Sequence, residues 1–464
     1  MKQKSGEFWL RVSGDSHFEP REFVGGRHFR IDHRAISEAI MQPLTIHMVD
    51  LLRIAASVYF MDRLISRNRR HGPQNWARTI SYSLEVQDPE FWAGSPVREA
   101  LHEALNFVSG DRWNLEFRPI VRNGLGGSEC QRSLDPNHLG ETRRVCLYSG
   151  GLDSAAGLAK QIVESPKAMT LAVTVQHRTD IGSMVKDQLQ LLTKHTRADL
   201  LPIVVPFEMD APKTLVRCEE KSQRSRAFLF VATGGVVAAA AGSRELELYE
   251  SGLGAINVPL LAGMEGSQAT RSAHPRFLEL MSRLLEHVIG HSFNVNLPFM
   301  SLTKGNVAKS LNCAALKELA KSTISCAHFP VRLKKGDKWK SCGLCPACIF
   351  RRVALHSAGI QEAGDVYQHD IFDSGCSQLH PKKLRYLTAY MLQIDSLQEI
   401  DAGDLPPLIT RHLRRTNILQ AGESPQMYLD LFRRYRSEWY ELIEQARRNG
   451  CALAYRIDVP GQAA

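Results

Sequence analysis

The stretch from Val145 to Ser154 combines residue types that bind phosphate. Its first four residues are mainly apolar, and the next six read Ser-Gly-Gly-Leu-Asp-Ser. Apolar residues then recur at helical spacing as far as Glu164, so the sequence predicts a turn between the carboxyl end of a strand and the amino end of a helix. Two glycines let the backbone approach an anion, helical N–H groups point at it, and two hydroxyls add donors. Asp153 would hold Mg²⁺ between phosphate oxygens. The expected phosphate-binding residues are Ser149, Gly150, Gly151, Leu152, Asp153 and Ser154.

Four cysteines form a second chemical signal. Cys342, Cys345 and Cys348 are separated by two residues each, and Cys326 lies upstream. These gaps let consecutive sulfurs reach one ion, and four thiolates suit tetrahedral Zn²⁺, so we predict a closed, structural zinc site. Redox chemistry at the Cys-x-x-Cys steps and an iron–sulfur cluster are the alternatives.

Alternating strands and helices must position these groups. Apolar strands separated by helices predict an α/β fold with a doubly wound parallel sheet, which binds ligands at the carboxyl edge of its strands. The loop at residues 149–154 belongs to that edge. Beyond the first strand, the expected strands are Met169–Val175, Leu200–Val205 and Leu246–Tyr249, and the expected helices are Asp153–Glu164, Ile181–His195 and Ser225–Ala241.

The parts that flank this region differ in pattern. Residues 1–125 are expected to form a separate α+β module, 126–142 a linker, 143–375 the catalytic domain and 376–464 a helical extension that could dock a partner. The module should contain strands at Phe8–Val12, Arg78–Val86 and Trp113–Val121 and a core-facing helix over residues 48–65. The polar residues expected on the outer face of that helix are Asp50, Arg53, Asp62, Arg63 and Arg67. The clearest helices of the extension are Lys382–Ile394 and Met427–Cys451.

The composition is that of a folded globular protein. The 464 residues are 44% hydrophobic and 23% charged, with a net charge of +9. This modest positive charge allows anionic partners. The basic segment Arg332–Lys340 could bind nucleic acid or be a solvated loop, and nucleic acid is not favoured because arginines and glutamates alternate in the extension. The amino terminus lacks the apolar core of a signal peptide and no run reaches membrane-spanning length, so we expect a cytoplasmic protein without a membrane partner. Ten cysteines in that reducing compartment favour metal binding or chemistry over disulfides.

The loop resembles the pyrophosphate loop of the N-type ATP pyrophosphatases, although a Gly-Ser turn of any α/β protein is the alternative. Together with Arg226, Lys304 and the four cysteines, it is similar in order and spacing to the 7-cyano-7-deazaguanine synthase (QueC) family. This resemblance spans residues 145–358 and implies a Rossmann-like fold, ATP, a zinc site and a carboxylate substrate, 7-carboxy-7-deazaguanine. ATP activates this carboxylate for attack by an amine, which in the ordinary family is ammonia and gives the amide and then the nitrile. The resemblance also implies that Asp153 holds Mg²⁺ and that Arg226 and Lys304 neutralise charge at the α-phosphate and the developing oxyanion.

The chain departs from that family in two ways. It is flanked by the amino-terminal module and the helical extension, and the family's Tyr-Pro-Asp-Cys stretch is replaced by residues 269–275, Ala-Thr-Arg-Ser-Ala-His-Pro. The enlarged chain is more similar to QueC-like proteins of bacterial anti-phage operons, the QatC type. That resemblance implies a partner protein, encoded in the same operon, whose amine accepts the deazaguanine.

Two histidines and two other functions stay open. His177 and His274 could recognise the base or move a proton, because neutral imidazole does either near pH 7, or they could be hydrogen-bonded structural residues. The other functions are sulfur transfer to tRNA by a thiolase-like pyrophosphatase, and an inactive scaffold that senses nucleotide.

Overall fold

The computed structural model describes most of the chain. The described residues are 8–12, 21–67, 77–120, 143–166, 168–177, 179–210, 220, 222–264, 271–314, 316–327, 340–362, 366–372 and 379–451. Within them, no helix is both long and apolar enough to cross a membrane.

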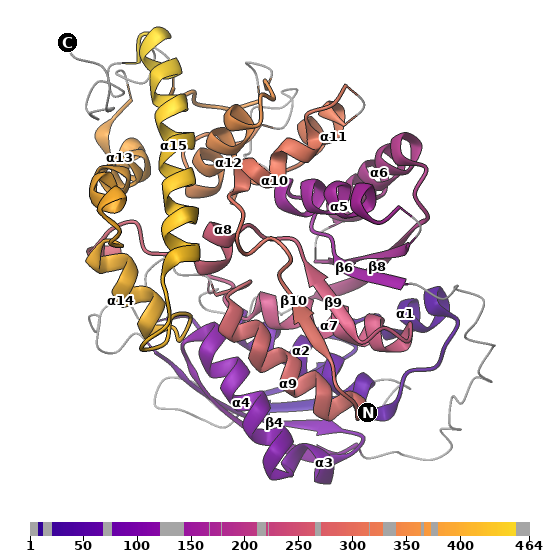
Figure 1. The fold of residues 1–464 in the computed structure, drawn as a ribbon. Helices are drawn as coiled ribbons and strands as arrows, with labels where there is room; N and C mark the ends of the chain where they lie inside the picture. Colours follow the sequence, from indigo (N-terminus) through magenta and orange to yellow (C-terminus); the bar gives the residue numbers. More distant parts are fainter. Residues whose placement is uncertain are drawn as a thin grey trace.

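A ten-stranded, mostly parallel sheet organises the molecule (Figure 1). Its strand order is β10-β9-β6-β7-β8-β3-β2-β1-β4-β5. The amino-terminal strands are β1 (Phe8–Val12), β2 (Arg21–Gly25), β3 (Phe29–Ile31), β4 (Thr79–Val86) and β5 (Arg112–Pro119). The remaining strands are β6 (Arg143–Leu147), β7 (Met169–Gln176), β8 (Leu200–Met209), β9 (Glu245–Leu248) and β10 (Asn294–Asn296).

The strands from β6 to β10 form a parallel half-sheet. β7 pairs with β6 on one side, whereas β9 pairs with β6 on the other, so the order of strands reverses between β6 and β9. Such a reversal opens a crevice outside the carboxyl ends of the two strands. The predicted parallel sheet is therefore present, and its order is compatible with a Rossmann-like fold. The ATP pyrophosphatase type stays a prediction.

Helices cover both faces of this half-sheet. One face carries α7 (Arg226–Ala240) and α9 (Pro275–Ile289), which share a hydrophobic core with the amino-terminal helices α2 (Ile46–Leu64) and α4 (Ser95–Ser109). A second core unites α5 (Leu152–Glu164), α6 (Thr179–Thr196), α10 (Lys304–Ala308) and α11 (Lys317–Ser322). The short helices are α1 (His33–Ile40), α3 (Pro89–Ala93) and α8 (Gly252–Ile256).

The amino-terminal residues do not form a sheet of their own. β3 pairs antiparallel with β8, where Ile31 lies opposite Phe207, and this pairing joins β1–β5 to the parallel half-sheet. The strands of this region extend the central sheet and its helices share the core of α7 and α9, and the expected division into a separate module stays a prediction. The bounds of the predicted domains stay a prediction, and the expected linker at 126–142 lies outside the described residues.

The sequence predicted that Asp50 and Asp62 of α2 lie on a solvated face. In the structure both side chains are fully buried. Asp50 accepts hydrogen bonds from the backbone N–H groups of Gln87 and Asp88, at 2.8 and 3.1 Å. Asp62 pairs with Arg78 and accepts from Ser225, which lies at the start of α7. Charged groups can be buried when paired and hydrogen-bonded in this way, so helical periodicity alone gave the wrong face.

The carboxyl-terminal helices form a third core. It contains α12 (Pro346–Ser357), α13 (Pro381–Asp395), α14 (Pro407–Arg415) and α15 (Gln426–Arg448), packed around buried side chains such as Trp439. α15 runs beside α8 and α12 (Figure 1), and α12 contributes Ile349 and Val353 to this core. The predicted helical extension is thus joined to the central part of the chain through α12.

Candidate active site

The loop after β6 lies at the predicted carboxyl edge of the sheet. β6 ends at Leu147 and α5 begins at Leu152, so the intervening turn opens at the point where the strand order reverses. Gly150 has φ +74°, in the left-handed region that favours glycine. A Cβ atom there would also collide with Met184 of α6. The backbone angle therefore favours glycine at position 150, and any side chain there would also displace the end of Met184.

Hydrogen bonds to Ile324 and Gln188 hold this loop in place. Gly150 O accepts from the N–H of Ile324 at 3.1 Å and from Gln188 Nε2 at 3.3 Å. The side-chain oxygen of Gln188 accepts from the Tyr148 hydroxyl at 2.9 Å. Gln188 thus connects Tyr148 and Gly150 to α6. No sequence motif points to this residue.

The two serines lie together on the loop. Their hydroxyl oxygens, Ser149 Oγ and Ser154 Oγ, are 3.3 Å apart, and Ser154 donates to Gly151 O at 3.0 Å. Gly151 is the N-cap of α5 and provides no side chain to cap the first-turn N–H groups. Free N–H groups at a helix amino terminus suit an anion such as phosphate. The geometry is compatible with the predicted phosphate site.

Lys304 pairs with Asp153. Lys304 begins α10 and donates from Nζ to Asp153 Oδ2, and their side chains are only 10% and 13% exposed. The Nζ atom also lies 5.0 Å from the centre of the Phe350 ring. Burial alone would lower the pKa of Lys304, but the carboxylates of Asp153 and Glu250 outweigh this effect and raise it. The lysine is therefore a fixed cation beside the loop.

Asp153 retains one oxygen for a ligand. Oδ1 is buried, and none of the described residues forms a hydrogen bond with it. A buried carboxylate oxygen without a donor is costly unless an ion or a ligand satisfies it. An oxygen ligand beside a phosphate-binding turn fits Mg²⁺, so the residues present are compatible with the predicted magnesium site.

Glu250 is a third ionisable group at this edge, and the sequence analysis gave it no role. It lies two residues after the end of β9, on the opposite side of the strand-order reversal from the loop. Burial, and after it the charge of Asp153, raise the pKa of Glu250 to about 8, although Lys304 opposes the increase. The next residue, Ser251, is fully buried, and no described residue hydrogen-bonds to its hydroxyl. In the sequence, Glu250 comes directly after the expected strand Leu246–Tyr249, and this position could have identified it as a candidate site residue.

Arg226 and His177 do not join Asp153, Lys304 and Glu250. Arg226 begins α7, donates to Gln223 Oε1 at 2.9 Å, and its guanidinium lies 5.7 Å from the centre of the Phe230 ring. His177 follows β7 and lies against the same ring. The structure therefore brings Arg226 and His177 to one aromatic side chain rather than to Lys304, and their catalytic roles stay predictions.

His274 is the N-cap of α9. Its Nδ1 atom accepts from the N–H of Arg276 at 3.1 Å. Burial, and after it the neighbouring His412 and Arg271, lower the pKa of His274 to about 3. An imidazole held neutral in this way cannot take up a proton near pH 7. The structure thus favours the structural alternative for His274 over a proton shuttle.

The four predicted cysteines converge. Their sulfur atoms all lie within 4.8 Å of one another, and Cys342 Sγ is 3.8 Å from Cys348 Sγ. Sulfurs placed tetrahedrally around Zn²⁺ at about 2.3 Å would lie about 3.8 Å apart. Backbone N–H groups of Leu344 and Cys345 donate to Cys342 Sγ at 3.4 and 3.3 Å, as suits a thiolate. This cluster could hold zinc, and Cys345 and Cys348 lie at the start of α12, which connects it to the wall of the site.

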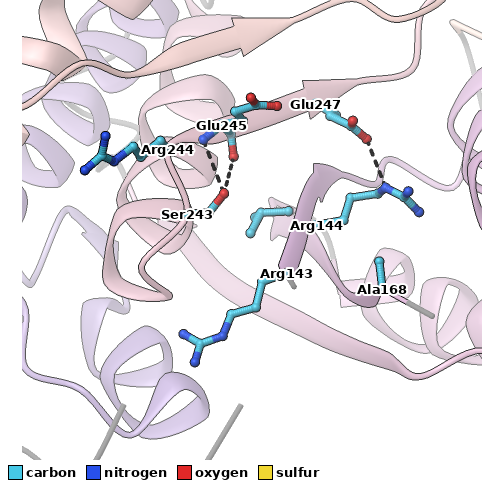
Figure 2. A pocket seen from close by; sticks show the side chains of 8 residues that line it. Arg143, Arg144, Ala168, Ser243, Arg244, Glu245 and Glu247 are labelled. Carbon is cyan, nitrogen blue, oxygen red and sulfur yellow. Dashed lines mark hydrogen bonds and ion pairs between the residues drawn. The ribbon is translucent and has the colours of Figure 1, made fainter. Parts of the chain in front are cut away.

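A pocket of about 320 Å³ lies elsewhere, at the amino ends of β6 and β9. Figure 2 shows that the guanidinium groups of Arg143, Arg144 and Arg244 point in different directions, and Arg144 pairs with Glu247. Because these charges diverge and lie at the opposite ends of the strands from the loop, the pocket is not part of the candidate site.

One comparison with known proteins bears on this arrangement. Residues 267–359 match the family model of the queuosine biosynthesis protein QueC. The match covers about a fifth of the chain and includes Lys304 and all four clustered cysteines. The loop at 149–154 and Glu250 lie outside it. The chain therefore has a QueC-like segment, and this segment supplies the lysine and the cysteine cluster.

Proposed function

We propose that this protein is a QueC-like, ATP-dependent enzyme that activates a carboxylate by adenylation and transfers the acyl group to an amine. The observation that carries the proposal is the ion pair between Asp153 and Lys304. It joins the phosphate-binding loop to the segment that matches QueC. A carboxylate is a poor electrophile, and adenylation supplies it with a good leaving group.

The residues near the reversal of strand order between β6 and β9 would each have a role in the adenylation step. The substrate carboxylate oxygen attacks the α-phosphorus of ATP, and the bond to the β-phosphate breaks to release pyrophosphate. Backbone N–H groups of the loop and the hydroxyls of Ser149 and Ser154 would hold the departing pyrophosphate. Lys304 would stabilise the charge that develops at the α-phosphate, a contribution worth about 3 kcal/mol for a well-placed donor. Mg²⁺ bound at Asp153 would neutralise phosphate charge.

Glu250 suits the second step. The amine nitrogen attacks the acyl carbon, the carbon–oxygen bond to AMP breaks, and the nitrogen must lose a proton. With a pKa of about 8, Glu250 is mostly protonated at pH 7, and its ionised fraction, which grows as the pH rises to 8, accepts that proton. Glu250 is therefore the proposed proton acceptor, and the cysteine cluster, with four protein ligands, would be structural.

The proposed substrate is 7-carboxy-7-deazaguanine or a close relative, and the proposed acceptor is the amine of a partner protein in an anti-phage system. The QueC-like segment supports the substrate class, because the family resemblance implies this carboxylate. The large regions on either side of the segment support a protein acceptor rather than ammonia alone.

Pyrophosphate release tests the proposal. We expect release from MgATP that depends on 7-carboxy-7-deazaguanine, and loss of that release in Asp153→Asn with an unchanged circular dichroism spectrum. The matched control is Asp187→Asn, which removes an exposed acid from α6. Full turnover in Asp153→Asn would remove the loop from the mechanism, and a requirement for tRNA would favour the thiolase-like alternative.

A further inference from the structure

One face of α15 lies against the segment that carries Lys304. Residues 431, 434, 435 and 438 fall on this face at helical spacing. Leu431 closely approaches Gly252, and Arg434 Nη2 donates to Ser301 O at 2.6 Å. Figure 1 shows α15 running beside α8 and α12. The carboxyl-terminal extension thus reaches the wall of the candidate site.

Tyr435, on this face of α15, packs against the aromatic ring that lies next to Lys304. Tyr435 contacts Phe350 edge to face, with ring centres 5.8 Å apart. Phe350 is the ring over which the ammonium of Lys304 lies. α15 therefore supports both the backbone and the ammonium group of Lys304.

Glu438 makes the most specific of these contacts. Its carboxylate accepts a hydrogen bond from the hydroxyl of Thr303 and lies directly against Gly305. Thr303 is the N-cap of α10, whose reciprocal bonds with Asn306 form a capping box. Glu438 is itself buried, so its hydrogen bond with Thr303 is shielded from water. The carboxylate thus contacts the residues on both sides of Lys304.

Gly305 makes this contact possible. A Cβ atom at position 305 would collide with the carboxyl group of Glu438, with the Cδ atom only 2.7 Å away. A side chain at position 305 would displace the carboxyl group of Glu438 from this contact. The glycine and the glutamate therefore form a matched pair across the two helices.

We propose that α15 is part of the catalytic apparatus and that Glu438 is a positioning residue, which holds the Thr303–Gly305 turn so that Lys304 meets the reacting phosphate. This inference rests on the proposed function. It assigns the helical extension a role in forming the site itself. A displacement of about 1 Å in a catalytic group costs up to about 100-fold in rate, so a loosened turn is expected to lower kcat.

Steady-state kinetics of pyrophosphate release provide the test. We expect Glu438→Ala to lower kcat between about 10-fold and 100-fold while KM for ATP changes less than about twofold. Glu438→Gln should retain most of the activity, because its amide oxygen still accepts from the hydroxyl of Thr303. The matched control is Glu444→Ala, which removes a partly exposed acid from the same helix. Equal losses in the alanine and glutamine variants, or loss only in KM, would overturn the inference.

A double-mutant cycle separates positioning from general damage. Gly305→Ala alone should lower kcat as much as Glu438→Ala, whereas the double variant should be no worse than Glu438→Ala, because the collision is then absent. Additive losses would contradict the matched pair.

Hydrogen exchange keeps the inference testable if the proposed reaction fails. If the wild type releases no pyrophosphate, the proposed function falls. Positioning is then judged from deuterium uptake of residues 299–308. Uptake that is faster than in the wild type for Glu438→Ala but not for Glu444→Ala supports the positioning role of Glu438. Uptake equal to that of the wild type in Glu438→Ala overturns it.

Discussion

The protonation of Glu250 gives a prediction that is independent of any substrate. An unfolded glutamate has a pKa of 4.5, and burial beside Asp153 raises the pKa of Glu250 to about 8. The folded protein therefore binds this proton more tightly than the unfolded chain. The stabilising contribution of the neutral acid is complete below pH 4.5 and is lost as the pH rises through 8.

The size of this effect follows from the two pKa values. One pK unit is worth about 1.36 kcal/mol, so the difference corresponds to at most about 5 kcal/mol. Glu250 is partly exposed, and solvent screening reduces the effect. We therefore expect the contribution to the free energy of unfolding to fall by about 2 kcal/mol between pH 5 and pH 8.5.

Glu250→Gln isolates this contribution. Glutamine keeps the shape of the neutral acid but does not ionise, so the variant should match the wild type near pH 5 and be more stable by about 2 kcal/mol at pH 8.5. Urea denaturation at both pH values, without Mg²⁺ or ATP, measures the difference. Glu245→Gln, at the exposed start of the same strand, controls for removal of an acid. A stability difference between Glu250→Gln and wild type that is the same at both pH values would refute the argument.

Three further outcomes are expected. Lys304→Met should lower the rate of pyrophosphate release by about 10²-fold to 10³-fold, and unaltered release would exclude the lysine from the chemistry. Cys348→Ser should lower the zinc content measured by inductively coupled plasma mass spectrometry, together with the thermal midpoint, whereas retained zinc would place the ion elsewhere. Asp62→Asn should lower the free energy of unfolding by about 3 kcal/mol in urea denaturation, because Arg78 loses a buried partner. Glu116→Gln, which breaks an exposed pair with Arg118, should cost less than about 1 kcal/mol, and similar costs for both would contradict the buried assignment.

The sequence predicted local features of the fold well. Every expected strand and helix after residue 143 is present, with ends shifted by a few residues. The clustering of the cysteines was also predicted and is confirmed, because a fixed spacing of ligands along the chain restricts where they can meet. Periodicity and spacing record such local restrictions.

Features that depend on distant contacts were not predicted. The pairing of β3 with β8 joins residues far apart in the chain, and no local pattern announces it. Asp62 follows the periodicity of a solvated face, yet Arg78 and Ser225 bury it. Glu250 and Glu438 likewise acquire their roles from partners on other elements. Single residues whose function depends on the arrangement of several elements leave little trace in one sequence.

The antiparallel pairing of β3 with β8 also determines where the chain can be cut. A fragment that begins at residue 143 would contain the whole candidate site, yet it would lack the strand that covers the carboxyl end of β8 and the helices packed on α7. Exposed strand edges and apolar helix faces recruit the same surfaces from neighbouring copies. Such a fragment is expected to aggregate, so a fragment that stays monomeric is expected to begin well before residue 143.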